Sequence, residues 1–298
     1  MQRILLTGAS GFIGQYLLKA LQSPSYNNLY EVIALASEPV DGCTTVLRKN
    51  FQIHKEDFHS LGIHQIDIVI HAGAYTPKDK MGMNDLANNN NVYSTDSLLN
   101  ALPGKVKQFI YLSTLDVYAN ADGVISEDSQ VLPASLYGMS KLYCEFMIDS
   151  WCKQQTVKYQ VLRIGHIYGP GEEKYKKLIP ITISKVLNKE RPEIINDGIE
   201  KRSFLNIHDC IQAILASLVL EDSGNIINIV SGKSYTVKEI ISMILEISGK
   251  GLEPVYKTIT ATPRHLVFDS TKMESLLHRE AVDFRLGLEE EIKGFRSR

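Results

Sequence analysis

The sequence predicts an α/β protein built on a doubly wound parallel β-sheet, with a smaller C-terminal lobe. Short, almost wholly apolar runs recur along the first half of the chain, and stretches with helical spacing separate most of them. Strands buried on both faces lack alternating polar residues, so this pattern favours a parallel sheet covered by helices on both sides. Three glycines, at positions 8, 11 and 14, follow the first run where the first helix should begin.

The first two elements are a strand and a helix. Arg3 to Thr7 is mostly apolar, and after the glycines apolar residues recur at helical spacing from Phe12 to Leu21. Right-handed crossovers between successive strands give the doubly wound arrangement. Further strands are expected at Glu31 to Ala36, Thr44 to Leu47, Ile66 to His71, Gln108 to Ser113 and Lys158 to Ile164.

The pattern changes after Gly169 to Glu173, which with the lysine-rich stretch that follows reads as a connection. Beyond it we expect a buried strand at Ile226 to Val230, a helix at Thr236 to Leu245 with a threonine cap, and a last helix at Leu286 to Phe295. The expected division is a domain of residues 1–168 and a lobe of residues 169–298, with about 203–232 returning to the main sheet.

Composition and charge exclude several classes of protein. The net charge is -2 with scattered Lys and Arg, which gives no basic surface for nucleic acid or anionic membrane. No apolar stretch approaches the roughly 20 residues that span a bilayer. The four cysteines form no CxxC pair, and the N-terminus lacks the features of a signal peptide. We expect a cytoplasmic protein with free thiols, no bound metal and a small-molecule partner.

The segment Thr7 to Gly14 has the chemistry of a phosphate-binding turn. The first glycine allows a tight turn, the second lets the backbone approach a pyrophosphate, and the third lets the helix pack on the strand. The N-terminus of the helix adds N–H groups and a positive dipole. The segment therefore predicts a Rossmann-type dinucleotide site that includes Gly8, Ser10, Gly11, Phe12, Ile13 and Gly14.

The end of the second strand bears on the choice of cofactor. An NAD site usually presents a carboxylate to the ribose hydroxyls there, whereas this chain has Ala36 and Ser37. Their lack of charge favours NADP over NAD, unless the strand ends later and Glu38 reaches the ribose. Arg48 or Lys49 is a candidate partner for the 2′-phosphate, with a solvated surface cation as the alternative.

Tyr137 and Lys141 stand four residues apart on one face of an expected helix. A phenol with its free pKa near 10 is a poor acid or base, and a neighbouring cation would bring that pKa toward working pH. Ser113 and Thr114 end a buried strand, where the carboxyl ends of a parallel sheet meet a ligand. A hydroxyl at that edge could bond both the substrate oxygen and the tyrosine.

These motifs, taken in order, resemble the extended short-chain dehydrogenase/reductases, and within them the NAD-dependent epimerase/dehydratase family of nucleotide-sugar enzymes. The resemblance spans essentially the whole chain. The motifs identify the superfamily, but they do not distinguish one of its reactions from another. The resemblance rests on glycines 8, 11 and 14, His71 to Ala74, Asn91-Val92, Ser113-Thr114 with Val117-Tyr118, Tyr137 to Lys141, and Leu162-Arg163 with Tyr168 to Pro170.

The resemblance implies a role for each matching residue. Thr114, Tyr137 and Lys141 would be the catalytic triad, with Thr114 also touching substrate and the other two also touching the cofactor. Further cofactor contacts would come from Asn50, Ala72, Gly73, Ala74 and Asn91, and further substrate contacts from His166, Arg202 and Arg264. Arginine suits the diphosphate of a nucleotide sugar because its planar guanidinium bonds two phosphate oxygens at once. A surface salt bridge is the alternative for each arginine.

Two departures from the family pattern matter. The family's dehydratases follow the threonine with an acid and a base, Asp then Glu, whereas this chain has Leu115 and Asp116. Leucine cannot protonate a leaving hydroxyl, which disfavours 4,6-dehydration. His166 stands where the family usually has Asn, so its contact with substrate competes with a core role.

Three functions follow from the resemblance. The first is an NADPH-dependent reductase of a 4-keto, usually 6-deoxy, nucleotide sugar, of the kind used in polysaccharide biosynthesis. The second is a 4-epimerase that keeps NAD bound. The third is a silent dinucleotide-binding sensor, against which the intact Thr114, Tyr137 and Lys141 argue. The sequence leaves open the nucleotide base, the hexose and the oligomeric state, a homodimer included.

Overall fold

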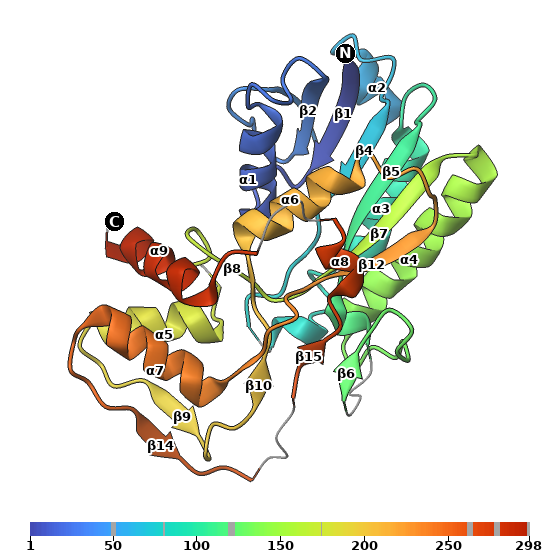
Figure 1. Cartoon of the computed structure of the whole chain (residues 1–298). Coiled ribbons are helices and arrows are strands. Elements are labelled where there is room, and N and C mark those ends of the chain that lie inside the picture. The colour runs from blue at the N-terminus through green and yellow to red at the C-terminus, as the bar shows by residue number, and fades with distance from the viewer. Residues whose placement is uncertain are drawn as a thin grey trace.

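A seven-stranded parallel sheet forms the centre of the larger part of the protein, in the order β12-β7-β5-β4-β1-β2-β3 (Figure 1). The structure is a computed structural model that describes residues 1–48, 52–79, 81–118, 123–173, 175–260, 265–276 and 281–296. The strands of this sheet are β1 (Gln2–Thr7), β2 (Tyr30–Ala36), β3 (Thr44–Leu47), β4 (Ile68–His71), β5 (Gln108–Thr114), β7 (Lys158–Ile164) and β12 (Asn225–Ile229).

The strand order reverses at β1, since β2 and β3 extend to one side of it and β4 and β5 to the other. This is the doubly wound topology, in which ligands bind outside the carboxyl ends of the strands where the order reverses. The predicted α/β class and parallel sheet are confirmed.

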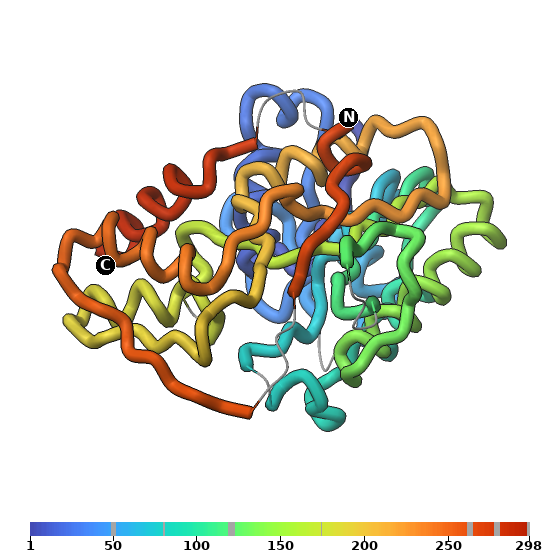
Figure 2. Tube along the Cα trace, turned by 60° about the horizontal axis from the view of Figure 1, so that its bottom comes forward, coloured from blue at the N-terminus to red at the C-terminus, as the bar shows by residue number. Residues whose placement is uncertain are grey.

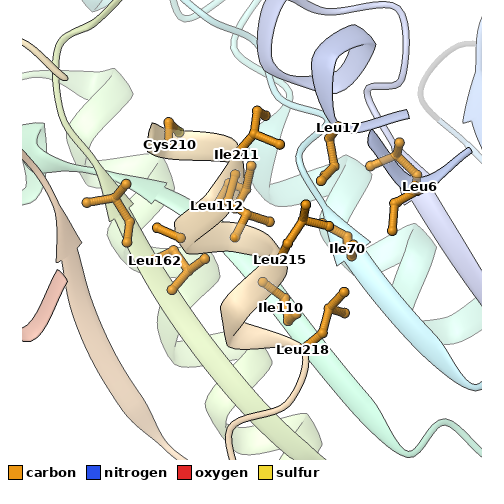
Figure 3. Close-up of a cluster of buried hydrophobic side chains, with 14 of the residues drawn as sticks. Leu6, Leu17, Ile70, Ile110, Leu112, Leu162, Cys210, Ile211, Leu215 and Leu218 are labelled. Atoms are coloured by element: carbon orange, nitrogen blue, oxygen red, sulfur yellow. The ribbon is translucent and has the colours of Figure 1, made fainter. Parts of the chain in front are cut away.

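Helices cover both faces of the sheet, because successive strand residues point to opposite sides. Leu6 packs into the core under α1 (Phe12–Leu21) and α6 (Ile207–Ser217). Leu5 packs into the opposite core, under α2 (Lys55–His59), α3 (Asn91–Ala101) and α4 (Leu136–Gln155). Figure 3 shows the first core, where side chains of α6 such as Ile211 and Leu215 lie over β1, β4, β5 and β7. Thus two segments of the second half of the chain return to this part of the molecule: β12 adds a strand to the sheet, and α6 covers one of its faces.

The later part of the chain forms a lobe beyond the carboxyl ends of the strands (Figures 1 and 2). Its helices are α5 (Leu178–Leu187), α7 (Val237–Ser248) and α9 (Phe284–Arg296), which share a third apolar core. Two strand pairs flank them, β9 (Glu193–Ile195) with β14 (Val255–Lys257), and β10 (Lys201–Arg202) with β13 (Tyr235–Thr236). The predicted threonine cap is confirmed: Thr236 accepts a hydrogen bond from the Glu239 amide at 3.1 Å.

Several short elements lie outside the main sheet and the three helices of the lobe. They are β8 (Ile167–Tyr168) with β11 (Leu205–Asn206), β6 (Val124–Ile125) with β15 (Val267–Phe268), η1 (Gly82–Asn84), η2 (Leu115–Val117) and α8 (Thr271–Glu274). Within the described ranges, no helix is both long and apolar enough to cross a membrane, and no group of three or more His, Cys, Asp or Glu side chains could hold a metal ion.

Two buried carboxyl groups meet where α9 packs against the segment that follows β8. Glu172 is 1% exposed and Glu291 is fully buried. Burial raises the pKa of both groups above the ordinary carboxyl range, and the charge of Glu172 raises the pKa of Glu291 further. Lys177 partly offsets this for Glu172, since its Nζ lies 3.7 Å from Oε2. The folded protein therefore favours the protonated form of the pair.

We expect Glu291→Gln to stabilise the protein at alkaline pH. A carboxyl whose pKa is raised on folding contributes stability below its unfolded pKa, about 4.3, and loses it as pH rises through the folded value. One pKa unit is worth about 1.4 kcal/mol, so the variant should exceed wild type by at least about that amount at pH 9, or roughly 2 °C or more in Tm. Thermal unfolding at pH 5 and pH 9 measures this. Glu290→Gln is the control, because Glu290 lies on the same helix with its side chain 51% exposed. Equal or lower stability of Glu291→Gln at pH 9 would contradict the expectation.

Candidate active site

The glycine turn between β1 and α1 is closely packed and suited to an anion. Gly8 has a φ of 71°. A Cβ on Gly8 would lie 2.7 Å from the Cα of Gly73, and a Cβ on Gly14 would lie 2.0 Å from the carbonyl oxygen of Gly8. Gly11 is the N-cap of α1 and offers no side chain to its amides, and the first turn holds no acidic residue. The dipole of this helix start, whose amides no side chain caps, therefore fits the pyrophosphate of a dinucleotide.

A buried chain of hydrogen bonds fixes the end of β4 beside this turn. Thr7 Oγ1 accepts from the backbone N–H of Gly73 at 2.8 Å and lies 2.7 Å from His71 Nδ1. His71 Nε2 lies 3.0 Å from Thr95 Oγ1. Burial lowers the pKa of His71 to about 3, so the imidazole is neutral, and a proton on Nε2 satisfies both contacts. Sequence reasoning missed Thr7, Thr95 and the role of the His71 ring, because only the fold brings them together.

The other end of the expected cofactor site lies at the ends of β2, β3 and β4. Ala36 is the last residue of β2, and its carbonyl accepts from the backbone N–H of Arg48 at 2.8 Å. Beside it is a cavity of about 240 Å³ lined by Arg48, Ala74, Tyr75, Asn88, Asn90 and Ser94. Burial lowers the pKa of Arg48. The backbone of an arginine is thus bonded to that of Ala36, a residue without a carboxylate. Ser37 and Glu38 come after Ala36, and both are exposed. Asn50 and Lys49 lie outside the described residues.

Asn91 connects the loop after β4 to α4. Its Oδ1 accepts from the Tyr75 amide at 2.7 Å, and its Nδ2 donates to Ser140 Oγ at 3.0 Å. Both ends of the amide are thus bonded within the protein, which gives Asn91 a bridging role. The expected direct contact of Asn91 with a cofactor stays a prediction.

The fold brings Thr114, Tyr137 and Lys141 together. Thr114 ends β5, and the other two lie on the first turns of α4, which Ser135 caps by accepting from the Gly138 amide at 3.1 Å. The hydroxyls of Thr114 and Thr76 both act on the Tyr137 phenol and lower its pKa, against the larger effect of burial. All three expected catalytic side chains are buried, at the carboxyl edge of the sheet.

The charge state of Tyr137 differs from the sequence prediction. Burial raises the pKa of the phenol well above its usual value, the charge of Asp116 raises it further, and the Thr114 hydroxyl opposes the shift. The prediction that Lys141 brings this pKa down is wrong for the protein alone. The Lys141 ammonium donates to the carbonyl of Leu112 at 2.6 Å and lies 4.2 Å from the centre of the Tyr111 ring. Burial lowers the pKa of Lys141 to about 8, against the opposing charges of Cys144 and Glu145.

A buried ion pair holds α4 against the sheet. Arg163 of β7 bonds Glu145 of α4 twice, through Nε to Oε1 at 3.1 Å and through Nη2 to Oε2 at 2.8 Å. Ser113 of β5 donates to the same carboxylate. The remaining guanidinium nitrogen donates to Tyr118 at 2.8 Å, and Tyr118 in turn donates to Asn228 of β12 at 2.7 Å. Glu145 lies one turn beyond Lys141, so this network positions the helix that carries Tyr137 and Lys141.

Two further expected substrate residues lie after β7 and on β10. His166 follows β7, and its ring centre lies 5.7 Å from that of Phe204. Arg202 lies on β10, where its guanidinium bonds Glu200 at 2.5 Å and the Lys201 carbonyl at 2.9 Å. This ion pair matches the alternative stated for that arginine, although its side chain remains 22% exposed. Arg264 lies outside the described residues.

Comparisons with known proteins bear on the family of the chain. The model of the "NAD dependent epimerase/dehydratase family" matches residues 4–230. A dTDP-D-glucose 4,6-dehydratase from Dictyostelium discoideum is 29% identical over 83% of this chain, and the chain covers 62% of that relative. The UDP-glucose 4-epimerase of Thermotoga maritima, solved with UDP-glucose, is 25% identical, with a TM-score of 0.84 over 99% of both chains. The UDP-glucuronic acid 4-epimerase of Bacillus cereus, solved with UDP-glucuronic acid and NAD, is 26% identical, with a TM-score of 0.83 over 99% of both.

We expect Arg163→Met to destabilise the protein more than removal of the whole ion pair does. The single change leaves the Glu145 carboxylate buried without its cation, which typically costs about 3–5 kcal/mol. Arg163→Met with Glu145→Leu replaces both charges by apolar groups and should lose less. Urea unfolding of wild type, the two single variants and the double variant measures the coupling. Arg285→Met is the control, since its pair with Glu246 is exposed and should be worth less than about 1 kcal/mol. Losses that simply add in the double variant would contradict the expectation.

Proposed function

The chain belongs to the NAD-dependent epimerase/dehydratase family, whose members modify nucleotide sugars, and from this premise we propose that it reduces the 4-keto group of a nucleotide-diphosphate sugar with NADPH. The observation that carries the proposal is the buried cluster of Thr114, Tyr137 and Lys141 at the carboxyl edge of the sheet. The glycine turn of β1 and α1 lies at the carboxyl edge of the same sheet. A dinucleotide and a carbonyl could thus meet there.

The proton step follows from the charge states of these side chains. A bound nicotinamide cofactor supplies the hydride that the carbonyl carbon receives. Tyr137 is a neutral phenol, because burial raises its pKa, so it carries a proton that the carbonyl oxygen can receive. The raised pKa also makes the phenol a weaker acid, so the transfer depends on groups that stabilise the phenolate. Thr114 can hold that oxygen in place through its hydroxyl. Lys141, whose pKa is lowered to about 8, is mostly cationic at pH 7 and can stabilise the phenolate left after proton transfer.

The residues at the expected adenosine end of the cofactor site favour NADP over NAD. Ala36 leaves the strand end without a carboxylate, and Arg48 lines the cavity next to it. A guanidinium there could pair with a 2′-phosphate, whereas a carboxylate would repel it. The lobe is proposed to bind the nucleotide sugar, and Arg202 would have to exchange Glu200 for a phosphate.

A 4-epimerase that keeps NAD bound is the second candidate. The structural relatives support it, since the Thermotoga maritima and Bacillus cereus enzymes are both 4-epimerases and the second was solved with NAD. An epimerase would use Tyr137 as base and then as acid, and it would consume no external cofactor. Dehydration has less support, because Leu115 stands in the position of the dehydratase acid.

We expect the purified protein to oxidise NADPH when a nucleotide 4-keto-6-deoxyhexose is added, and Tyr137→Phe to lose about 10²–10⁴-fold in rate, because it removes only the proton donor. Loss of absorbance at 340 nm measures the reaction. Binding of NADPH, followed by fluorescence, should be nearly unchanged and serves as the control for folding. A variant that keeps more than a tenth of the rate would defeat the assignment of Tyr137. Interconversion of nucleotide sugars at C4 without consumption of NADPH would instead select the epimerase.

Ala36→Asp should shift the preference from NADP to NAD by at least about tenfold. The new carboxylate offers charged hydrogen bonds to the ribose hydroxyls, worth about 1.5–3 kcal/mol, and it repels a 2′-phosphate. A tenfold change corresponds to 1.4 kcal/mol. Dissociation constants of both cofactors measure the ratio. Glu38→Gln is the matched control: an unchanged ratio in Ala36→Asp together with weaker NAD binding in Glu38→Gln would place Glu38, and not Ala36, at the ribose.

A further inference from the structure

The segment between β4 and α3 reaches the first turn of α4, which carries Tyr137. Asn84 is the last residue of η1, and its Oδ1 accepts a hydrogen bond from the backbone N–H of Leu136 at 3.0 Å. Asn89 precedes α3, and its Nδ2 donates to the backbone carbonyl of Leu136 at 3.2 Å. Two asparagine side chains from a distant part of the sequence thus bond both polar groups of one backbone unit.

The start of α4 needs such partners. Leu136 is the first residue of the helix, and the N–H groups of a first turn have no acceptor within the helix. Ser135 accepts from the Gly138 amide, and Asn84 accepts from the Leu136 amide. The second bond is therefore a cap supplied from outside the helix. Its loss would loosen the residue that directly precedes Tyr137.

The segment that carries the two asparagines is itself held by hydrogen bonds. The Tyr75 hydroxyl donates to the carbonyl of Gly82 at 3.1 Å. Asp85 Oδ1 accepts from the Asn88 amide at 3.1 Å, and the Asp85 carbonyl accepts from the Asn89 amide at 3.1 Å. Because these bonds fix the loop independently of α4, its side chains can serve as fixed points for the helix.

Other contacts restrain the same turn of α4 from further sides. A Cβ on Gly138 would lie 2.3 Å from a backbone carbonyl oxygen of η2, so the turn packs directly on η2. Ser140 Oγ donates to the Tyr137 carbonyl at 2.8 Å and accepts from Asn91 Nδ2 at 3.0 Å. The segment before α3 and the start of α3 therefore hold the helix on both sides of Tyr137, at Leu136 and at Ser140.

We propose that Asn84 and Asn89 are positioning residues, which hold the Leu136 backbone so that the Tyr137 phenol stays within reach of the substrate oxygen. The inference rests on the proposed function, in which Tyr137 gives the proton. Proton transfer requires the donor within hydrogen-bond reach of the acceptor, and a misplacement of about 1 Å can cost about 10²-fold in rate. In this role neither asparagine contacts the cofactor, so their loss lowers kcat and leaves cofactor affinity unchanged.

Aspartate substitutions at the two positions have opposite expected effects. Asn84→Asp keeps an oxygen that accepts from the Leu136 N–H, whereas Asn89→Asp replaces the donor by an oxygen that faces the Leu136 carbonyl. Both variants add the same charge beside the same residue, so the difference between them reports the hydrogen bond. Asn84→Ala and Asn89→Ala remove each bond without adding charge. Ser223→Ala is the matched control, because Ser223 Oγ accepts the backbone N–H of Tyr159 at 3.1 Å, near the amino end of β7.

The first readout is kcat with NADPH and a nucleotide 4-keto-6-deoxyhexose, together with the dissociation constant of NADPH. We expect kcat to fall at least about tenfold in Asn89→Asp and at least about threefold in each alanine variant. Asn84→Asp and Ser223→Ala should stay within about twofold of wild type, and NADPH should bind equally well to all of them. A wild-type kcat in Asn89→Asp, an equal fall in both aspartate variants, or a fall explained by weaker NADPH binding would overturn the proposal.

Hydrogen exchange separates failure of this inference from failure of the proposed function, because it needs no substrate. The amides of Leu136 to Ser140 should exchange faster in Asn84→Ala and Asn89→Asp than in wild type, since exchange follows local opening. Mass spectrometry of the peptide that contains this turn measures the rates, with Ser223→Ala expected to match wild type. If these differences appear and wild type shows no turnover, the proposed function fails and the hold on α4 stands. Unchanged exchange in both variants would overturn the role of the asparagines, whatever the activity.

Discussion

The ion pair between Glu145 and Arg163 is the interaction on which the geometry of the site depends. Two charges taken out of water cost several kcal/mol each unless every donor and acceptor finds a partner. Here Ser113 and Tyr118 supply the additional partners, and Asn228 extends the network to β12. The pair thus joins α4 to three strands of the sheet. Since Tyr137 and Lys141 precede Glu145 on α4, the rotation and depth of that helix decide where the phenol lies relative to Thr114.

A second constraint acts at the other end of the site, where two backbones touch. Gly8 and Gly73 approach so closely that neither position has room for a side chain. Thr7 and the neutral imidazole of His71 hold the two strand ends at that distance. These hydrogen bonds are buried, so the loss of any one of them would leave a buried polar group without a partner and would lower the stability of the fold. The turn is therefore rigid before any dinucleotide arrives, which lowers the entropic cost of binding one.

The electrostatics of the site come from burial more than from pairing. Burial raises the pKa of Tyr137 and lowers that of Lys141, so both groups favour their neutral forms more than they would in water. The Lys141 ammonium donates to the carbonyl of Leu112, whereas the carboxylate of Asp116 raises the pKa of the Tyr137 phenol. The protein alone is thus arranged to hold a proton on Tyr137. The raised pKa makes the phenol a weaker acid, so a further positive charge is needed to stabilise the phenolate, whether Tyr137 acts as an acid or as a base.

The sequence by itself determined the α/β class, the positions of the strands in the main sheet, the glycine turn and the residues Thr114, Tyr137 and Lys141 of the buried cluster. These features are encoded locally, because apolar runs, glycine spacing and the four-residue separation of Tyr137 and Lys141 each depend on a short segment. The tertiary structure alone decided which groups carry charge and which are bonded to one another. The direction of the Tyr137 pKa, the bond of Lys141 to Leu112, the pairing of Arg202 with Glu200 and the meeting of Glu172 with Glu291 all depend on burial and on contacts between distant segments. Desolvation and Coulomb energies depend on distance and depth in the folded molecule, and neither quantity is written in the order of residues along the chain.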